Sequence, residues 1–371
     1  MGRGMDLRGW GKSELFRERF GSKNYMIDEE ANEYSDIAGV HPILFCGMPT
    51  VEAIEKTLAS LDEDSSNGPD LVPTRILKRC AKALAPALHL LILAILKFGE
   101  WPTIWREHWI VFLYKRKSVY DPGNYRGIHL TSQISKVAEK VIASLFVPQL
   151  ICSGAYGRNQ FAYMPERGAR YALAQLVLTW IFRFAKRCKI AIYCSDVSGA
   201  FDKVNSRGLL PKLRARGFPD AVLLVIQSWL YERRARVAVS GKCSRGMMIH
   251  NMVYQGTVLG PPLWNIYYAD AAVAVNLHGF LEIIFAGDLN CFNDFGLHTP
   301  NSELHDEMCS CQQELHRWGR ANQVSFDPNK ESMHVLALHE REGPNFRLLG
   351  VPFDNALSMK DAVIELVSEA T

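Results

Sequence analysis

The spacing of hydrophobic residues predicts alternating helices and strands over most of the chain. Helices are predicted where apolar side chains recur every three or four residues, and strands where short apolar runs are bounded by turn residues. The segments that fit a helix are 51–61, 76–98, 132–145, 169–187, 206–217, 221–232, 257–275 and 303–320. The segments that fit a strand are 109–114, 125–130, 190–194, 236–239, 248–253, 281–285, 289–295, 324–326, 333–338 and 346–349.

Tight turns separate several of the predicted strands. The run 109–114 is followed by the basic residues 115–117 and by a turn around 121–124, after which the run 125–130 begins. This order predicts a hairpin with a basic tip. Ala286, Gly287 and Asp288 form the turn of a second predicted hairpin. Because helices alternate with strands that tight turns connect, we expect an α+β fold with an antiparallel sheet at its centre.

Composition and charge indicate a candidate binding surface. The 371 residues are 48% hydrophobic and 22% charged, which excludes disordered, collagen-like and coiled-coil classes. The net charge of +3 hides an uneven distribution, since residues 1–70 carry 14 acidic and 7 basic side chains, whereas residues 153–245 carry 17 basic and 5 acidic ones. The middle of the chain is therefore a candidate surface for a polyanion, with solvated helix faces as the alternative.

Several patterns bear on the compartment and on metal binding. The first thirty residues lack the apolar stretch of a signal peptide, and the apolar run 84–96 is short for a bilayer and is interrupted by Pro86, so we expect an intracellular protein without a membrane partner. Nine scattered cysteines without a Cys-x-x-Cys pair argue against a disulfide framework. Four potential zinc ligands lie close together in the sequence: His305, Cys309, Cys311 and His316. Their spacing is uncommon for a zinc site, and the segment that contains them fits a surface helix, which is the alternative interpretation.

Two carboxylates stand where metal-dependent phosphoryl transfer needs them. Asp196 follows the strand 190–194, and Asp288 stands at the turn of the second hairpin. Adjacent strands can hold two such side chains close enough to share divalent metal ions. Each carboxylate taken alone is more often a turn or cap residue, so the surrounding motifs decide between these interpretations.

Six motifs follow one another along residues 67–354. They are Asn124-Tyr125-Arg126-Gly127-Ile128-His129-Leu130, Asn159-Gln160-Phe161 with Arg167-Gly168, Asp196-Val197-Ser198-Gly199-Ala200-Phe201-Asp202, Gln255-Gly256-Thr257-Val258-Leu259-Gly260-Pro261, Trp318 with Asn322 and Lys330, and Leu348-Leu349-Gly350-Val351. In this order the chain resembles the reverse transcriptase of non-LTR (LINE-type) retrotransposons. The resemblance implies an RNA-directed DNA polymerase that uses an RNA template, a DNA primer and deoxynucleoside triphosphates, with a nuclear location by family analogy. No obligate protein partner is evident.

The resemblance also implies a right-hand polymerase architecture. Residues 1–48 are then an irregular N-terminal extension, 49–188 the fingers with N-terminal helices, and 189–355 the palm with its antiparallel sheet. Residues 356–371 would be the start of a thumb that is largely missing, and no endonuclease domain precedes the fingers.

Site residues follow from the resemblance as well. Asp196, Asp288 and Lys330 would be catalytic, and Asp196, the carbonyl of Val197 and Asp288 would hold two Mg²⁺ ions. Nucleotide binding would involve Lys115, Lys117 and Arg126 at the triphosphate, Phe201 at the position of a ribose 2′-hydroxyl, and Gln255 and Gly256 at the incoming nucleotide and the templating pair.

One position departs from the family pattern. The family has aromatic-Ala-Asp-Asp at the catalytic hairpin, whereas this chain has Phe285-Ala286-Gly287-Asp288. Glycine fits a tight turn, so the fold is expected to survive, but one of three carboxylates for two metal ions is absent. We therefore expect impaired polymerase activity. The alternatives are a non-catalytic nucleic-acid-binding remnant of the same fold and an unrelated α+β enzyme with accidental matches.

Two further acids near these motifs are interpreted as structural. Asp202 is expected to cap the helix 206–217. Tyr268-Ala269-Asp270 superficially resembles the missing motif, but it lies on the predicted helix after Gly256 and has Ala271 where the second acid belongs.

Overall fold

The computed structural model describes residues 10–21, 47–115, 118–250, 252–337, 339, 341–355 and 357–370. These residues form two compact units, each assembled from separate stretches of the chain. Unit 1 contains residues 10–21, 47–155 and 201–267, and unit 2 contains residues 156–200 and 268–370. The chain therefore crosses between the units at residues 155, 200 and 267. The ranges assigned to fingers, palm and thumb stay predictions.

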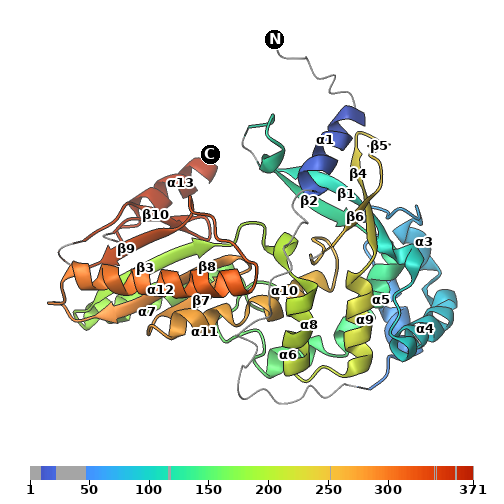
Figure 1. Ribbon diagram of the computed structural model, residues 1–371, viewed down its shortest axis with the longest axis horizontal. Coiled ribbons are helices and arrows are strands. Elements are labelled where there is room, and N and C mark those ends of the chain that lie inside the picture. The colour runs from blue at the N-terminus through green and yellow to red at the C-terminus, as the bar shows by residue number, and fades with distance from the viewer. Residues whose placement is uncertain are drawn as a thin grey trace, which may run out of the picture. The chain divides into compact units, whose positions relative to one another are not determined.

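Unit 1 contains most of the helices (Figure 1). Thr50 caps the second helix as expected, since its Oγ1 accepts a hydrogen bond from Ala53 N at 3.2 Å. The helices of unit 1 are α1 (Trp10–Gly21), α2 (Val51–Ala59), α3 (Thr74–Arg79), α4 (Ala81–Phe98), α5 (Gln133–Ser144), α6 (Val147–Cys152), α8 (Ser206–Ala215), α9 (Asp220–Leu230) and α10 (Gly260–Tyr268), whose last residue lies across the boundary. Three 3₁₀ turns accompany them, η2 (Thr103–Arg106), η3 (Pro122–Asn124) and η4 (Ala200–Lys203).

Helix α1 corrects the expectation that the first 48 residues are irregular. It has almost no amphipathic pattern, which is why the sequence did not predict it, and tertiary contact supports it instead. The ring of Phe16 stacks on Phe112 with the centroids 4.1 Å apart, and Glu14 Oε1 accepts a hydrogen bond from Arg245 N at 2.7 Å. Residues 1–9 and 22–46 of the predicted extension lie outside the described residues.

Helix α4 continues through Pro86, within the segment 76–98 that was predicted to be helical. Proline removes one backbone donor from a helix, but the buried residues Ala85, Leu88 and Ile92 pack this helix against α2 and α9. Over its 18 residues, α4 is the one described helix whose length and composition would allow it to cross a membrane, contrary to the expectation from the run 84–96. A third of the residues of α4 are buried, and they pack one face of this helix in unit 1.

The sheet of unit 1 has two faces of different character. Its strands are β1 (Glu107–Tyr114), β2 (Tyr125–Leu130), β4 (Arg233–Val239), β5 (Lys242–Cys243) and β6 (Met247–Ile249), in the order β2-β1-β4-β5 with β6 beside β4. The predicted hairpin of β1 and β2 is confirmed, with Trp109 opposite Leu130. Burial alternates along β1, β2 and β4, so one face packs on the core and the other is open.

Unit 2 is built on the antiparallel sheet that the sequence predicted (Figure 1). Its strands are β3 (Lys189–Asp196), β7 (Leu281–Phe285), β8 (Asp288–Phe295) and β9 (Ser332–Leu336), in the order β7-β8-β3-β9, and a smaller sheet pairs β10 (Phe346–Leu348) with β11 (Val351–Phe353). Its helices are α7 (Ala169–Ala185), α11 (Ala271–Asn276), α12 (Asn301–Ala321) and α13 (Lys360–Ala370). The α+β prediction is confirmed.

Helices cover both faces of this sheet. Ile190 and Ile192 of β3 pack with Trp180 of α7 in one buried cluster. On the other face, Cys291 Sγ of β8 lies 3.8 Å from Cys311 Sγ of α12. Because both sides of β3 are buried, its sequence is a continuous apolar run rather than an alternating one.

Candidate active site

The two predicted catalytic carboxylates are neighbours at one end of the unit 2 sheet. Asp196 is the last residue of β3, Asp288 is the first residue of β8, and the two are direct partners in the antiparallel register. Partners of this kind project to the same face, with Cβ atoms roughly 5 Å apart. The strand pairing therefore brings together two acids that are distant in the sequence.

Lys330 joins this pair. Its Nζ forms an ion pair with Asp196 Oδ2. The loop before it is fixed by the backbone, because Asp327 N donates to the carbonyl of Asp196 at 2.9 Å and Lys330 N donates to the carbonyl of Asp327 at 2.9 Å. All three residues that were predicted to be catalytic thus lie in one cluster, at a pocket of about 620 Å³ in unit 2.

The surroundings of Asp288 change its protonation. Burial, the charge of Asp196 and a hydrogen bond with Asp196 raise the pKa of Asp288 from 3.8 to about 7, and the charge of Lys330 opposes this shift. Burial alone would lower the pKa of Lys330, but its contact with Asp196 and the nearby acids raises that pKa overall. A cation bound here would favour the ionised form of Asp288.

The turn between β7 and β8 does not require glycine at position 287. The left-handed residue is Ala286, with φ +58°, and Gly287 has no positive φ. A Cβ atom at Gly287 would lie 3.4 Å from Asp196 Oδ1 and 3.5 Å from Val197 Cβ, which is ordinary van der Waals distance. A side chain at this position would therefore fit, and it would begin beside the carboxylate of Asp196.

The donor set was compared with the needs of a divalent cation. Hard divalent cations prefer carboxylate oxygens, and Asp196 and Asp288 offer two carboxylates on one face of the sheet. Within the described ranges no group of three or more His, Cys, Asp or Glu side chains could hold a metal ion. The pair therefore fits one shared cation, whereas a second cation lacks the third carboxylate. Val197, the other predicted ligand, has a buried side chain, and its N–H donates to the carbonyl of Gly287 at 3.0 Å.

The residues considered for zinc have other contacts. His305 Nε2 lies 3.3 Å from Glu342 Oε1, His316 Nε2 lies 2.7 Å from Glu331 Oε1, and Cys311 faces Cys291 in the core. These side chains of α12 therefore point to different neighbours.

The motif Asn159-Gln160-Phe161 supports the turn between β7 and β8. Its backbone pairs with the end of β7, where Phe161 N donates to the carbonyl of Ile284 at 2.9 Å. The buried side chain of Gln160 accepts a hydrogen bond from Ala286 N at 3.4 Å. This motif therefore positions the turn that precedes Asp288.

In unit 1, Gln255 and Gly256 lie against the β1–β2 hairpin. The carbonyl of Gln255 accepts a hydrogen bond from His129 N at 2.7 Å. Gly256 has φ +102°, and a Cβ atom there would lie 2.9 Å from the carbonyl oxygen of His129 and 3.0 Å from Ile128 Cγ2. Only glycine allows the loop to approach the strand this closely.

The other predicted nucleotide-binding residues are also in unit 1. Phe201 is half-buried, and its ring centroid lies 6.0 Å from that of Trp264 in the helix after the Gly256 loop. Lys115 follows β1, and its Nζ donates to the carbonyl of Gly123 at 3.4 Å. Arg126 is exposed on β2, and Lys117 lies outside the described residues.

A buried carboxylate beside the Gln255–Pro261 motif was not predicted from the sequence. Glu139 of α5 is fully buried, and its Oε2 accepts hydrogen bonds from Val258 N at 2.8 Å and Leu259 N at 3.1 Å. Burial raises the pKa of Glu139, while the charge of Arg233 and these hydrogen bonds oppose the shift. Glu139 lies on the apolar face of α5 with Val137 and Ile142, and a charged residue in such a pattern was the signal available in the sequence.

The two acids interpreted as structural have different outcomes. The expectation for Asp202 is wrong, because Asn205 caps α8 by accepting a hydrogen bond from Arg207 N at 2.9 Å, and Asp202 lies earlier, in η4. Asp270 is buried and accepts a hydrogen bond from Trp318 Nε1 at 3.0 Å. Asp270 thus ties the start of α11 to α12, in agreement with a structural role.

Comparisons with known proteins agree with the motifs. Residues 114–353 match the family described as reverse transcriptase (RNA-dependent DNA polymerase). The chain is 28% identical over 267 residues to the RNA-directed DNA polymerase from mobile element jockey of Drosophila melanogaster, covering 70% of this chain and 29% of the relative. It is 25% identical over 309 residues to the probable RNA-directed DNA polymerase from transposon X-element of the same species, covering 81% and 33%.

A third relative belongs to another type of element. It is the retrovirus-related Pol polyprotein from type-1 retrotransposable element R2 of Bradysia coprophila, 28% identical over 236 residues, covering 63% of this chain and 26% of the relative. The chain thus spans about a third or less of the length of these relatives.

Proposed function

Since the chain belongs to the reverse transcriptase (RNA-dependent DNA polymerase) family, of the non-LTR retrotransposon type, we propose that it carries a nucleotidyl transfer site that Gly287 impairs. The observation that supports this proposal is the cluster of Asp196, Asp288 and Lys330, in which residue 287 begins beside Asp196 but has no side chain.

The proposed reaction extends a DNA primer on an RNA template. The 3′-hydroxyl of the primer loses its proton to solvent, and its oxygen attacks the α-phosphorus of a deoxynucleoside triphosphate. A new P–O bond forms, and the bond to pyrophosphate breaks. Asp196 and Asp288 would hold the divalent cation, for which we propose Mg²⁺, and that cation would lower the pKa of the attacking hydroxyl and offset phosphate charge. Lys330 would place a positive charge beside the departing pyrophosphate.

Residues of unit 1 would bind the nucleotide and the template. Lys115, Lys117 and Arg126 of the hairpin would contact the triphosphate, Arg126 in bidentate fashion. Phe201 would occupy the space of a ribose 2′-hydroxyl, which favours deoxynucleotides. The bare backbone at Gly256 would allow the close approach of the templating pair.

The absence of a carboxylate at position 287 explains the proposed impairment. A site for two cations normally offers more negative charge than Asp196 and Asp288 supply, and Lys330 already neutralises part of Asp196. Loss of one group that stabilises the transition state commonly lowers a rate by about 10² to 10³. We therefore infer that the second cation binds weakly and that this chain extends primers slowly.

Primer extension on an RNA template tests the proposal. Gly287→Asp is expected to increase the rate by about 10² or more, because it restores the third carboxylate beside Asp196. Gly287→Ala is the matched control, since it adds the Cβ atom alone and should leave the rate unchanged. Rapid extension by the unmodified chain, or equal rates for Gly287→Asp and Gly287→Ala, would contradict the proposal.

A second candidate function is binding without catalysis. Exposed members of the 17 basic side chains of residues 153–245 favour it, because they could hold a template–primer duplex even where chemistry fails. Lys189, Lys212, Arg216 and Arg233 are buried and do not belong to this surface. Affinity that falls steeply with salt, together with no extension by Gly287→Asp, would support this alternative. An affinity for the duplex that does not change with salt concentration would contradict this alternative.

A further inference from the structure

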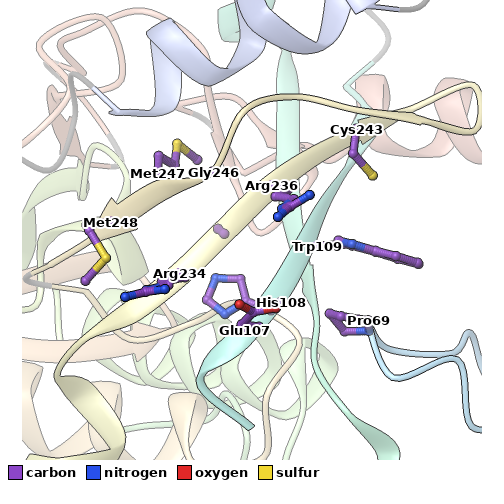
Figure 2. A pocket seen from close by; sticks show the side chains of 11 residues that line it. Pro69, Glu107, His108, Trp109, Arg234, Arg236, Cys243, Gly246, Met247 and Met248 are labelled. Atoms are coloured by element: carbon purple, nitrogen blue, oxygen red, sulfur yellow. The ribbon is translucent and has the colours of Figure 1, made fainter. Parts of the chain in front are cut away.

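A pocket of about 640 Å³ lies on the sheet of unit 1. Figure 2 shows Arg234 and Arg236 along β4, Trp109 on the neighbouring β1, and Pro69 on a separate loop beside the indole. Met248 of β6 completes the apolar part of the lining. The volume is in the range of sites that hold a small organic molecule, about 300 to 1,000 Å³.

The register of β1 and β4 places the side chains that line this pocket next to one another. β1 and β4 are parallel, with Glu107 beside Arg234 and Trp109 beside Arg236, so these four side chains project from the open face of the sheet. Within the described part of the chain, the side chains of Arg234 and Arg236 form no ion pair or hydrogen bond. Two guanidinium groups are therefore available to an external anion.

The combination of groups selects the ligand chemistry. An indole ring offers a surface for stacking a planar base, and guanidinium groups bind phosphate oxygens in bidentate fashion. The carboxylate of Glu107 can accept a hydrogen bond from a base amino group. A base pair inside a duplex could not stack on Trp109, because neighbouring pairs cover both of its faces, so the pocket favours a nucleotide outside a duplex.

The same face of the sheet reaches the loop proposed to contact the templating pair. In the register of β1 and β2, Trp109 is opposite Leu130, and Arg126, Ile128 and Leu130 alternate onto this open face. Ile128 Cγ2 lies 3.0 Å from the Cβ position of Gly256. One strand of nucleic acid that runs along this face would therefore pass from Gly256 toward the pocket.

We propose that the Trp109–Arg234–Arg236 pocket binds one unpaired nucleotide of the single strand that leads to the templating position. The proposal rests on the proposed function, since it uses Gly256 as the place of the templating pair. The base stacks on Trp109, and Arg234 and Arg236 contact the flanking phosphates. The pocket would then hold the template ahead of the site.

The test measures the affinity of the full chain for RNA–DNA template–primers by fluorescence anisotropy. One probe has a 5′ RNA overhang of ten nucleotides, and a second is a blunt duplex of the same length. Trp109→Ala is expected to weaken binding of the overhang probe about tenfold, without changing binding of the blunt duplex. Arg236→Gln should reduce the dependence of log affinity on log salt by about one. Trp109→Phe, which retains a ring, should recover most of the loss.

Overhang probes with single abasic sites locate the nucleotide. At the nucleotide that stacks on Trp109, loss of the base should weaken binding of the unmodified chain and have no further effect on Trp109→Ala. Arg79→Gln is the matched control for charge, because Arg79 is a largely exposed arginine of unit 1 outside the pocket, and it should leave the preference for the overhang unchanged.

The outcomes separate the two proposals. If the unmodified chain binds neither probe, the proposed function fails. If it binds both probes and Trp109→Ala weakens both equally or neither, the pocket proposal is wrong while the proposed function stands. The pocket proposal would also be wrong if, at every position of the abasic site, loss of the base weakened binding by Trp109→Ala as much as binding by the unmodified chain.

Discussion

The position of Asp288 in the fold disfavours the ionised form of its carboxyl group. Its partner in the register is another carboxylate, and burial adds to the cost of its charge, so its pKa is raised from 3.8 to about 7. An acid with a raised pKa binds its proton more tightly in the folded chain than in the unfolded one. Ionisation of Asp288 therefore costs stability above about pH 7, and this cost disappears as the pH falls toward 4.

Asp288→Asn tests this cost without a metal ion. The amide has nearly the same shape and no charge, so the variant is expected to be more stable than the unmodified chain at pH 8. The difference should shrink as the pH falls from 7 to 4. Urea unfolding in the presence of a chelator measures it. A difference that stays constant with pH would show that Asp288 is ionised normally.

At the scale of elements, Glu139 connects α5 to the start of α10. Val258 and Leu259 immediately precede that helix, and their N–H groups donate to a single buried carboxylate oxygen. The first N–H groups of a helix have no partner within the helix, and a carboxylate at this end also matches its dipole. Glu139 thus fixes the loop that contains Gly256 from a distant part of the sequence.

Glu139→Ala is expected to lower the free energy of unfolding by about 3 kcal/mol, because it leaves two N–H groups without their buried acceptor and removes the negative charge near the buried Arg233. Glu139→Gln keeps an acceptor oxygen and should recover part of this loss. Denaturant unfolding measures both variants, and Glu100→Ala, at an exposed loop position, should stay within about 0.5 kcal/mol. A loss for Glu139→Ala no larger than this control would exclude the connection.

Elements with local signals could be predicted from the sequence, and those held by distant contacts could not. The hairpin of β1 and β2 was predicted because its turn residues lie between two apolar runs. The parallel pairing of β1 with β4 and the helix α1 depend on residues far apart in the chain, such as Phe16 and Phe112. No local pattern records such pairings, and propensity yields to tertiary contact there.

The candidate site shows the same distinction. Asp196 and Asp288 could be predicted because each ends or begins a strand within a motif, and the structure brings them together with Lys330. Glu139 was not predicted, although its place in the apolar pattern of α5 was a local signal. Arg233 was not predicted, since its burial depends on distant residues such as Trp105. The positive φ at Ala286 rather than Gly287 was equally beyond the sequence, because the turn type depends on how β7 and β8 pair.

For the whole molecule, buried neutral histidines should dominate the response to acid. Burial lowers the pKa of His129 to about 3 and that of His334 to about 4, and it lowers the pKa of His108 well below its usual range. These histidines bind protons in the unfolded chain below about pH 6.5 but not in the folded one. Stability is therefore lost as the pH falls below 6.5, opposite in sign to the effect of Asp288.

His129 alone should contribute a loss of about 2 kcal/mol between pH 7 and pH 5, given its shift from 6.5 to about 3. The matched variant is His129→Phe, which keeps a ring beside His108 and Tyr254 and cannot take up a proton. Urea unfolding measures the free energy of unfolding at pH 7 and at pH 5. Between these two pH values, His129→Phe should lose about 2 kcal/mol less than the unmodified chain. Equal losses would mean that His129 gains its proton within the folded chain, which its burial between β1 and the Gly256 loop opposes.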